Sequence, residues 1–531
     1  MTTRTVIRIV MIVALWLQGS VLPVRSATEM PFTMRASISL WDQIQAAGTP
    51  VALTVAKERI TATRTLPRFY NQRLYFLAWS TERGPLPHAD NFLTALRDAP
   101  QEGLSPNGYH TGRIKEMLRE LRQQQAQETP LNPTTVAALD LLLTDAFLTY
   151  GSHLLLGRSG PEQWGGAQLD VDLAEALQHA LDTGRIADTL HALLPPQPEY
   201  ARLRQAVAHY RAMEAAGGWP TVPAGPSLRR NDRSKRVELL RTRLRITGDL
   251  PDAVSGEATL FDGTMERAVR TFQQRHGVPV TGVVDVDTLQ ALNVPVATRV
   301  HQLLQNLDRW RWLPNDLGQR HILVNVPTFT LEAIENSRTQ LTMRVVVGKP
   351  SWPTPIFSAP MTYIVLRPEW NVPDNIAREE LLPIIRKNPS YLASRDMEMR
   401  MSGGRLRIRQ APGPRNPLGD VKFMFPNRFH VYLHDTPSRS LFSRGTRAFS
   451  HGCVRLEKPM ELAAYVLRDS PEWTPQRVRT VLAKRTARTV PLPEPIPVHL
   501  VYRTAWVNED GTVQFRHDVY GHDALRAKGT S

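Results

Sequence analysis

The sequence predicts a multidomain α+β protein, helical in its amino-terminal half and mainly β toward its carboxyl end. Three observations lead to this prediction. The chain has 531 residues, more than a single hydrophobic core usually supports. Apolar residues recur at helical spacing up to about residue 225 and alternate with period two beyond about residue 319. Its 42% hydrophobic and 22% charged residues are ordinary for folded protein.

The first residues are typical of an export signal. Arg4 and Arg8 precede an unbroken apolar run from Ile9 to Leu17, and small residues follow it. A basic end, a short apolar core and small residues describe a secretory signal peptide, which we expect over residues 1–26. The run is shorter than the roughly 20 residues of a membrane span, and an uncleaved anchor is the alternative. No later segment approaches a transmembrane helix, so we expect a protein that works outside the inner membrane.

Residues 35–228 are predicted to form a helical scaffold domain. The clearest helix runs from Thr134 to Arg158, where apolar residues repeat at helical spacing and Gly157 lies near the end. The stretch Gly217–Leu228 is rich in glycine and proline, which predicts a linker after the scaffold. We see no chemistry in this region.

Residues 235–296 are predicted to form a small domain of three short helices. Gly248 and Gly277 would end the first two helices, and a turn at Gly282 leads into the third. The residue order resembles the peptidoglycan-binding domain type 1, which implies that the apolar residues form its core; the alternative is a module that only spaces its neighbours. The residues that carry the resemblance are Phe261, Asp262, Thr264, Ala268, Val269, Phe272, Gln273, Gly277, Gly282, Thr288, Leu289 and Asn293.

A connecting helix rich in Trp and Arg is expected within residues 297–318, followed by a mainly β domain over 319–525. A helical insertion is expected within 368–400, and a hairpin turning at Asp510–Gly511 near the end. The strand candidates are His321–Ser337, Leu341–Pro350, Met361–Trp370, Leu406–Gln410 and Phe429–His434.

Cys453 is the only cysteine of the chain. An exported protein usually pairs its cysteines in disulfides, so a lone one is either a buried apolar residue, an intermolecular disulfide or a reactive thiol. Acyl transfer needs a thiolate, a base and donors for the oxyanion. His434, at the end of a predicted strand, can supply the base, and Gly452 leaves room for substrate and for main-chain N–H groups.

The stretch Ser450–Arg455, with sequence SHGCVR, resembles the active-site signature of the L,D-transpeptidases, whose catalytic domain is of the YkuD type. The segments Arg409–Gly419 and Arg367–Pro383 and the residues around His434 resemble the large, multidomain enterobacterial members. In those proteins the second segment belongs to an insertion that caps the substrate. With the wall-binding unit and the helical scaffold, the resemblance extends over nearly the whole chain after the signal.

The resemblance implies that Cys453 is the nucleophile and His434 the general base. In this family a backbone carbonyl usually orients the histidine; the side chain of Asp435 is the alternative, although adjacent side chains on a strand point to opposite faces. Ser450, His451 and Gly452 would shape the pocket and the oxyanion region, and His451 is the weaker candidate for the base.

Other residues are candidates for binding substrate. Arg455 would bind a substrate carboxylate or hold its loop through an ion pair, and both readings stay open. The aromatic and basic residues that we expect to line the cleft or pack beside it are Tyr432, Phe442, Arg447 and Trp370. Asn416 and Gly419 are expected to shape a turn.

No metal or cofactor is expected. His430 and His434 are four residues apart, but on a strand this spacing does not form a metal site, and the HExxH helix is absent. The net charge of +15 favours an anionic partner. No P-loop, zinc-finger spacing or RNA-binding signature is found, which disfavours nucleic acid. The family resemblance implies that the partners are peptidoglycan stem peptides and glycan, with other cell-wall synthesis proteins as possible partners.

The resemblance implies a periplasmic enzyme that forms 3→3 peptidoglycan cross-links through a cysteine thioester and releases D-Ala, and that carbapenems inhibit. Two alternatives keep the thioester: with water as acceptor the enzyme is an L,D-carboxypeptidase, and with a protein lysine it anchors lipoproteins to the wall. A third alternative is a wall-binding scaffold protein with an inert thiol.

Overall fold

The computed structural model describes residues 30–46, 53–158, 171–252, 256–403, 405–484 and 486–525. The chain divides into two compact units, residues 1–158 with 169–195, and residues 159–168 with 196–531. The predicted export signal, residues 1–26, lies outside the described residues. Among the helices that are described, none combines the length and the apolar character needed to cross a membrane. The mixed helical and β content confirms the predicted α+β class.

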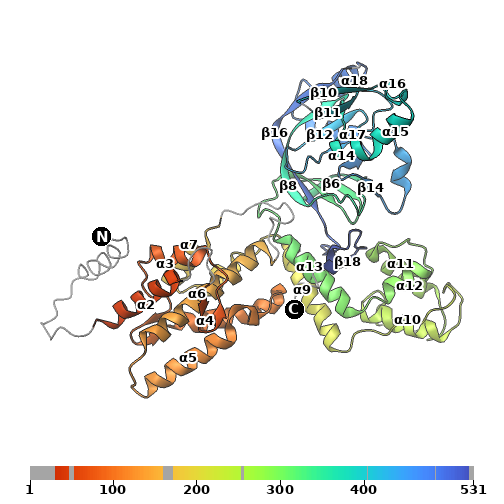
Figure 1. The fold of residues 1–531 in the computed structure, drawn as a ribbon. Coiled ribbons are helices and arrows are strands. Elements are labelled where there is room, and N and C mark those ends of the chain that lie inside the picture. Colours follow the sequence, from red (N-terminus) through yellow and green to blue (C-terminus); the bar gives the residue numbers. More distant parts are fainter. Residues whose placement is uncertain are drawn as a thin grey trace. The chain divides into compact units, whose positions relative to one another are not determined.

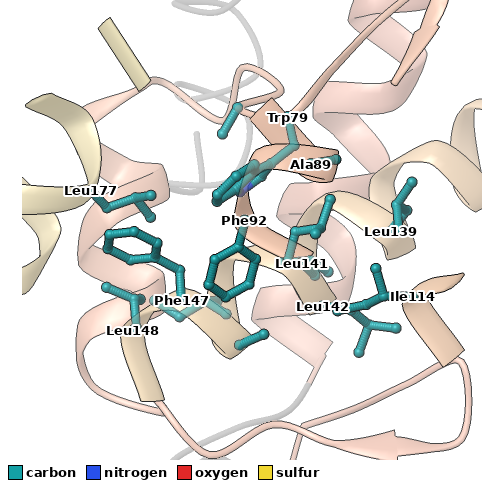
Figure 2. Packing of buried hydrophobic residues seen from close by; sticks show 14 of the residues in the cluster. Trp79, Ala89, Phe92, Ile114, Leu139, Leu141, Leu142, Phe147, Leu148 and Leu177 are labelled. Carbon is teal, nitrogen blue, oxygen red and sulfur yellow. The ribbon is translucent and has the colours of Figure 1, made fainter. Parts of the chain in front are cut away.

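The first unit is built around one long buried helix, α6 (Pro133–Leu156). The ring of Phe147, a residue of this helix, packs against those of Trp79 and Phe92, and the two contacts that Phe92 makes both have centroids 5.7 Å apart (Figure 2). Asn132 caps the helix by accepting a hydrogen bond from its first turn. The other elements are α2 (Phe32–Ala46), β1 (Thr54–Val55), β2 (Glu58–Arg59), α3 (Thr65–Gln72), β3 (Ser80–Thr81), β4 (Gly84–Pro85), α4 (Pro87–Ala95), η1 (Leu96–Glu102), η2 (Pro106–Tyr109), α5 (Thr111–Ala126), α7 (Leu173–Thr183) and α8 (Ile186–His191).

Two buried aspartates of α6 hold the segments around it. Asp140 accepts hydrogen bonds from the amides of Ala78 and Trp79, at 2.8 and 2.9 Å. Asp145 accepts one from the amide of Ala62 at 2.6 Å. Burial raises the pKa of Asp140 to about 6, although these amide bonds oppose the shift. These carboxylates satisfy backbone groups that would otherwise be buried without partners.

The helix α9 (Pro198–Ala215) belongs to the second unit, whereas the sequence predicted that the scaffold domain would continue to residue 228. It packs along α13 (Val296–Trp310), the expected connecting helix (Figure 1). Arg311, directly after α13, donates a hydrogen bond of 2.7 Å to the hydroxyl of Tyr200. The boundary between the two units therefore comes before α9, because α9 contacts α13. The linear sequence does not show this contact.

The three short helices of the predicted small domain are α10 (Lys235–Ile246), α11 (Gly263–His276) and α12 (Val286–Leu292). The side chains of Ser234, Asp262 and Asp285 accept hydrogen bonds from their first turns, and Gly277, at φ +65°, ends α11 as predicted. The buried core is Val222, Leu228, Val237, Leu240, Leu244, Leu250, Phe261, Met265, Ala268, Val269, Phe272, Val284 and Leu292.

The region from residue 320 to residue 501 contains a nine-stranded sheet that closes on itself, because β6 pairs with both β5 and β7. The strands in order across the sheet are β14 (Ala448–Ser450), β7 (Arg338–Gly348), β15 (Val454–Leu456), β13 (Leu433–His434), β12 (Val421–Met424), β8 (Phe357–Leu366), β16 (Arg488–Val501), β5 (Arg320–Asn325) and β6 (Thr330–Glu335). The short helices of this region are η5 (Arg439–Ser443), α17 (Pro459–Leu467) and α18 (Pro475–Leu482).

The strand predicted over Phe429–His434 is wrong in length, because only Leu433 and His434 pair in the sheet. The side chain of Asn427 accepts hydrogen bonds from the amides of Phe429 and Val431, at 3.0 and 3.2 Å. These bonds form a turn that places His430 at φ +55°. The chain therefore enters the strand only just before His434.

The predicted insertion forms a separate small layer, which we call the cap and which runs from Trp370 to Gln410. Its strands β9 (Trp370–Asn371), β10 (Met397–Ser402) and β11 (Arg405–Gln410) form a sheet in the order β10-β11-β9. The stretch Leu406–Gln410, predicted as a strand of the domain, is therefore a strand of the cap. Its helical segments are α14 (Asp374–Ile376), the π-helix η4 (Ala377–Leu381), α15 (Leu382–Lys387) and α16 (Tyr391–Ser394). Val372, Ala377, Leu381 and Ile408 form its buried core.

The predicted hairpin at Asp510–Gly511 is present as β17 (Ala505–Val507) and β18 (Val513–Phe515), but it is shorter than expected. Its expected first residues, Val498–Val501, belong to β16, and α19 (His522–Leu525) follows the hairpin. Gln302 of α13 donates hydrogen bonds to the carbonyls of Thr504 and Arg516, at 3.2 and 3.0 Å. These two hydrogen bonds therefore hold the hairpin against the connecting helix α13.

Candidate active site

The register of β12, β13 and β15 places a group of polar side chains on one face of the sheet. His434 of β13 lies opposite Lys422 on one side and opposite Arg455 on the other. In this parallel register, Cys453 comes opposite Tyr432, and alternation puts its side chain on the same face as that of Arg455. The intervening residues, among them Leu433, Val454 and Phe423, point the other way and are fully buried in the core.

The loop before Cys453 is held by hydrogen bonds around Ser450 and Gly452. The Ser450 hydroxyl donates to the carbonyl of Cys453 at 2.5 Å and accepts from the amide of Gly452 at 3.1 Å. Thr354 donates to the Gly452 carbonyl at 2.8 Å. Gly452 adopts φ +108°, a conformation that side-chain-bearing residues avoid. Since Ser450 already binds the Gly452 amide, that amide is not free to bind an oxyanion, whereas no acceptor within the described residues binds the amide of Cys453.

The thiol of Cys453 is half-buried, and burial raises its pKa above the ordinary value. Hydrogen bonding from the main chain of Tyr432 and the positive charges of Lys422 and Arg455 act in the opposite direction. The Lys422 ammonium lies 3.8 Å from the centroid of the Tyr432 ring. The resting residue is therefore a thiol in a field that favours its thiolate.

His434 is only 4% exposed and is held by its own backbone. Its Nδ1 lies 2.5 Å from the carbonyl oxygen of Asp435, so the ring donates from Nδ1 and keeps Nε2 as the acceptor. Burial, together with the nearby charges of Arg455 and Lys422, lowers its pKa to about 3. The ring is therefore neutral at physiological pH and able to take a proton. It makes no hydrogen bond to Cys453 among the contacts of the described residues, so the resting pair is not an ion pair.

The carboxylate of Asp435 does not orient the histidine. It accepts a hydrogen bond from the amide of Asp420 at 2.8 Å and lies 3.3 Å from Arg439. Gly419 beside it adopts φ +61°, and a Cβ at that position would overlap the Asp435 carboxylate. The backbone carbonyl of Asp435 takes the orienting role, and Gly419 makes the close approach possible.

A cavity of about 520 Å³ lies over Cys453, and residues of both the sheet and the cap line it. Trp370, Tyr432, His434 and Arg455 are among its lining residues. The cap contributes Trp370, Pro373, Asn375, Ile376 and Glu380 to its wall. A concave site of this size can enclose a short peptide and limit the access of water.

The cap contacts the loop of Cys453 through one polar pair. Nε2 of His451 lies 2.6 Å from Oε1 of Glu380 in η4. The ring of Trp352 packs edge-on against His451, with centroids 5.6 Å apart. His451 therefore forms part of the wall of the cavity and is hydrogen-bonded to Glu380.

Three segments of the chain match models of known protein families. Residues 319–486 match the family model described as the L,D-transpeptidase catalytic domain, residues 233–292 match the "Putative peptidoglycan binding domain", and residues 64–207 match the scaffold domain. The chain carries an L,D-transpeptidase catalytic domain and a peptidoglycan-binding domain. The resemblance stated from the sequence is thereby confirmed.

A curated relative of the chain comes from Haemophilus influenzae and is described as a "Putative L,D-transpeptidase". It is 34% identical over 258 residues, which cover 44% of this chain and 52% of the relative. The chain thus spans about half the length of the curated relative that it matches.

Two solved structures are similar to the chain at low TM-scores. An L,D-transpeptidase from Stackebrandtia nassauensis has a TM-score of 0.21 at 14% identity and covers 55% of this chain and 99% of its own. An L,D-transpeptidase from Mycobacterium smegmatis has a TM-score of 0.19 at 14% identity and covers 34% and 58%.

Two residues expected at the cleft of the transpeptidase domain lie elsewhere. Arg447 is not among the residues that line the cavity; its guanidinium donates to the carbonyls of Arg444, Thr328 and Phe329. Phe442 is buried and also outside the cavity lining. Neither residue lies in a strand of the sheet: Phe442 is part of η5, and Arg447 lies in the loop before β14.

The expected turn at Asn416 and Gly419 is present. The buried side chain of Asn416 donates to the carbonyls of Pro368 and Ala411, at 3.0 and 3.1 Å, and accepts from the amide of Leu418. These bonds join the two ends of the cap, because Pro368 precedes it and Ala411 follows it. The turn therefore closes the base of the cap.

The sequence reasoning missed Lys422 and Glu380. Lys422 alternates with the buried Val421 and Phe423, a pattern that would have placed it on the polar face had this segment been recognised as a strand. Glu380 lies in the segment Arg367–Pro383, which was recognised as part of the capping insertion, but only the tertiary structure brings this residue to His451. Within the described residues, no cluster of three or more His, Cys, Asp or Glu side chains could hold a metal.

Proposed function

We propose that the chain is a periplasmic L,D-transpeptidase that uses Cys453 as nucleophile and His434 as general base to form 3→3 cross-links in peptidoglycan. The observation that carries the proposal is the juxtaposition of thiol, imidazole and two cations on one sheet face under a capped cavity. A lone cysteine with only a packing role would not need an imidazole, two cations and a cavity beside it. The net charge of +15 suits a polymer that bears carboxylates.

In the first step, His434 takes the thiol proton on Nε2, and the sulfur of Cys453 attacks the carbonyl carbon between the third residue of a tetrapeptide stem and its terminal D-Ala. A C–S bond forms and the C–N bond to D-Ala breaks. The proton held on His434 passes to the leaving nitrogen, so D-Ala departs with a neutral amine. A thioester remains on Cys453. The cations Lys422 and Arg455 would stabilise the negative charge on sulfur before it attacks.

In the second step, the side-chain amine of another stem attacks the thioester carbon. A C–N bond forms, the C–S bond breaks, and the amine proton returns to sulfur through His434. Burial of the cavity under the cap favours the amine over water by limiting solvent access. His434 thus takes up a proton and gives it away once in each step, so it ends the cycle neutral.

The test is intact-mass spectrometry of the purified protein after exposure to a carbapenem or to tetrapeptide muropeptides. The wild type is expected to gain one carbapenem mass, and Cys453→Ala to gain none. His434→Asn is expected to slow D-Ala release by roughly 10²- to 10⁴-fold, the usual contribution of a general base. A carbapenem adduct that persists in Cys453→Ala would overturn the choice of nucleophile.

The muropeptide products distinguish the acceptors. Cross-linked dimers support transpeptidation, free tripeptides support a carboxypeptidase, and a mass gain on an added lipoprotein supports anchoring. If the wild type forms no adduct and no product, the scaffold alternative is correct and the proposed activity is wrong.

A further inference from the structure

The cap has one strand edge that no described strand covers. β10 is the outer strand of a sheet in the order β10-β11-β9, so among the described residues it pairs with β11 alone. None of its residues lines the cavity over Cys453. An uncovered edge presents a row of amides and carbonyls that another strand can bind. This edge is therefore a candidate binding surface, separate from the site described above.

The register of the cap hairpin shows which backbone groups of β10 face this edge. The amide of Ala411 donates to the carbonyl of Asp396 at 3.0 Å, at the start of the pairing between β10 and β11. In an antiparallel pair the hydrogen-bonded positions recur at every second residue, so the even-numbered residues of β10 bind β11. The amides and carbonyls of Met397, Met399 and Met401 therefore point to the free edge.

The side chains of β10 divide between an apolar and a charged face. Met397 packs against the core of the cap, whereas Met399 and Met401 on the same face are 44% and 68% exposed. Glu398 and Arg400 occupy the opposite face. Edge strands that remain in water usually carry charged residues or proline, whereas methionine is favoured at adaptable binding surfaces. The exposed methionines therefore favour a strand that has a partner.

The segment Met397–Met401 is complementary to itself, because it reads Met-Glu-Met-Arg-Met. When two copies are paired antiparallel about Met399, Glu398 of each copy stands opposite Arg400 of the other. We propose that β10 pairs with β10 of a second copy of the chain in this register, so that the two cap sheets join across a two-fold axis. Both copies then contribute the same surface, as in most homodimers. The inference does not depend on the proposed function.

The outward backbone groups fit this register. The two copies of Met399 exchange both hydrogen bonds at the axis, and Met397 of each copy does so with Met401 of the other. Glu398 and Arg400 then form the non-hydrogen-bonded pairs, in which Cα atoms are roughly 4.5 Å apart and side chains come closest. Opposite charges at such positions stabilise a sheet. A slip by two residues places either two glutamates or two arginines opposite each other, which disfavours that register.

The pairing requires only a small rearrangement of side chains. Arg400 donates to Glu398 of its own chain at 2.8 Å, and Arg409 of β11 binds the same carboxylate at 2.6 Å. When Arg400 turns to the second copy, Arg409 keeps each Glu398 paired. A single short strand on each side is small beside the roughly 20–30 residues of a standard interface, so we expect a weak dimer that depends on concentration.

The first experiment tests the register by disulfide cross-linking of the full-length chain. Cys453→Ala removes the only cysteine, and Met399→Cys or Met401→Cys is added to it. At the axis the two Cα atoms of position 399 are roughly 5.5 Å apart, within the range of a disulfide. The two positions 401 are offset by four residues, roughly 13 Å along the strand, beyond that range. Under mild oxidation we expect Met399→Cys to form a linked dimer on a non-reducing gel. Met401→Cys is the matched control and should stay mainly unlinked, although position 401 is the more exposed.

The second experiment exchanges the charges and follows the dimer by sedimentation velocity over a range of concentrations. Glu398→Arg and Arg400→Glu each place like charges opposite each other, so each variant alone should raise the dimer dissociation constant by roughly tenfold or more. An equimolar mixture of the two variants restores opposite charges in both pairs, so mixed dimers should form about as well as wild-type dimers. Arg386→Glu makes the same charge change at an exposed position of α15, outside β10, and should leave the dissociation constant unchanged. Melting temperatures check that each variant is folded.

Three outcomes overturn the inference. If both cysteine variants link equally well, the contact is random collision and not this register. If the mixture of charge variants forms no dimer while the wild type does, the dimer uses another surface. If the wild type stays monomeric at every concentration and Met399→Cys does not link, the occupant of the edge is a strand of another protein and not a second copy. Neither readout involves the reaction of Cys453, so each of these outcomes leaves the proposed function standing.

Discussion

At the scale of single residues, Cys453 differs from an ordinary buried cysteine because two cations lie near its thiol. A buried thiol has a raised pKa and is a weak nucleophile, and His434 is neutral at rest and makes no bond to it among the described contacts. Lys422 and Arg455 are the charges that favour its thiolate. A neutral imidazole carries no charge that could lower the pKa of the thiol, so the cations are the groups that favour the thiolate here.

Lys422→Met tests this division of roles. The methionine keeps the packing on Tyr432 and removes the charge, so the pKa of Cys453 should rise further. Alkylation of the thiol by iodoacetamide at neutral pH should slow by roughly 3- to 10-fold, as for the loss of a charge interaction of about 1 kcal/mol. The pH profile of the alkylation rate measures this change.

Lys458→Met is the matched control, because Lys458 is exposed and pairs with Glu461 at 3.6 Å, outside the cavity over Cys453. Its alkylation profile should equal that of the wild type. An unchanged profile in Lys422→Met would show that Lys422 does not act on the thiol.

At the scale of elements, the turn at Gly419 connects the base of the cap to the histidine. Gly419 adopts φ +61° and leaves space for the carboxylate of Asp435, whose main-chain carbonyl orients His434. The bonds of Asn416 to Pro368 and Ala411 fix the same turn. A backbone change at this turn should therefore reach the base without touching substrate.

Gly419→Ala is expected to destabilise the protein by about 1–3 kcal/mol, because alanine in a left-handed conformation is strained and its Cβ overlaps Asp435. D-Ala release should fall more than carbapenem binding, since the base is displaced and the cavity remains. Urea denaturation and kcat measure the two effects.

Gly413→Ala provides the comparison for this variant. No atom lies within 4 Å of a Cβ at Gly413, in the same loop, so that variant should keep both stability and rate. Equal effects of the two substitutions would contradict the role assigned to Gly419.

At the scale of the whole molecule, buried histidines make the second unit sensitive to acid. Burial lowers the pKa of His434 to about 3 and of His499 to about 4, and it lowers that of His276 in α11 well below its usual range. These groups are neutral when folded and take up protons on unfolding below about pH 6.5. Asp435 and Asp523, whose pKa values burial raises, act in the opposite direction.

We expect the stability of the second unit to be fully present above about pH 6.5 and to fall as the pH drops toward 4. Each histidine that gains a proton only on unfolding contributes a slope of about 1.4 kcal/mol per pH unit. His499→Gln should reduce the slope by up to that amount. Urea denaturation followed by circular dichroism between pH 4 and 7.5 gives the slope, and a stability independent of pH in this window would contradict the burial of neutral histidines.

Much of the fold follows from local pattern. The helix of Thr134–Arg158, the three short helices with their glycine ends and the strands from His321 onward were predicted from periodicity and turn residues, which act over a few positions. Phe429–His434 was predicted as one strand, but the side chain of Asn427 turns the chain there. Such a hydrogen bond from a side chain to the backbone competes with strand pairing. The alternation of apolar and polar residues in the sequence gives no sign of it.

The sequence by itself determined the fold class, the family resemblance and the candidate pair Cys453 and His434, because the residue types that chemistry requires stand in short distinctive motifs. Only the tertiary structure decided which charges surround that pair. Lys422, Arg455 and Glu380 come from three separate segments. Strand register places Lys422 and Arg455 on either side of His434, and the packing of the cap brings Glu380 to the cavity that Arg455 also lines. Contacts between distant segments depend on the packing of the whole domain, and no local pattern in the chain records them.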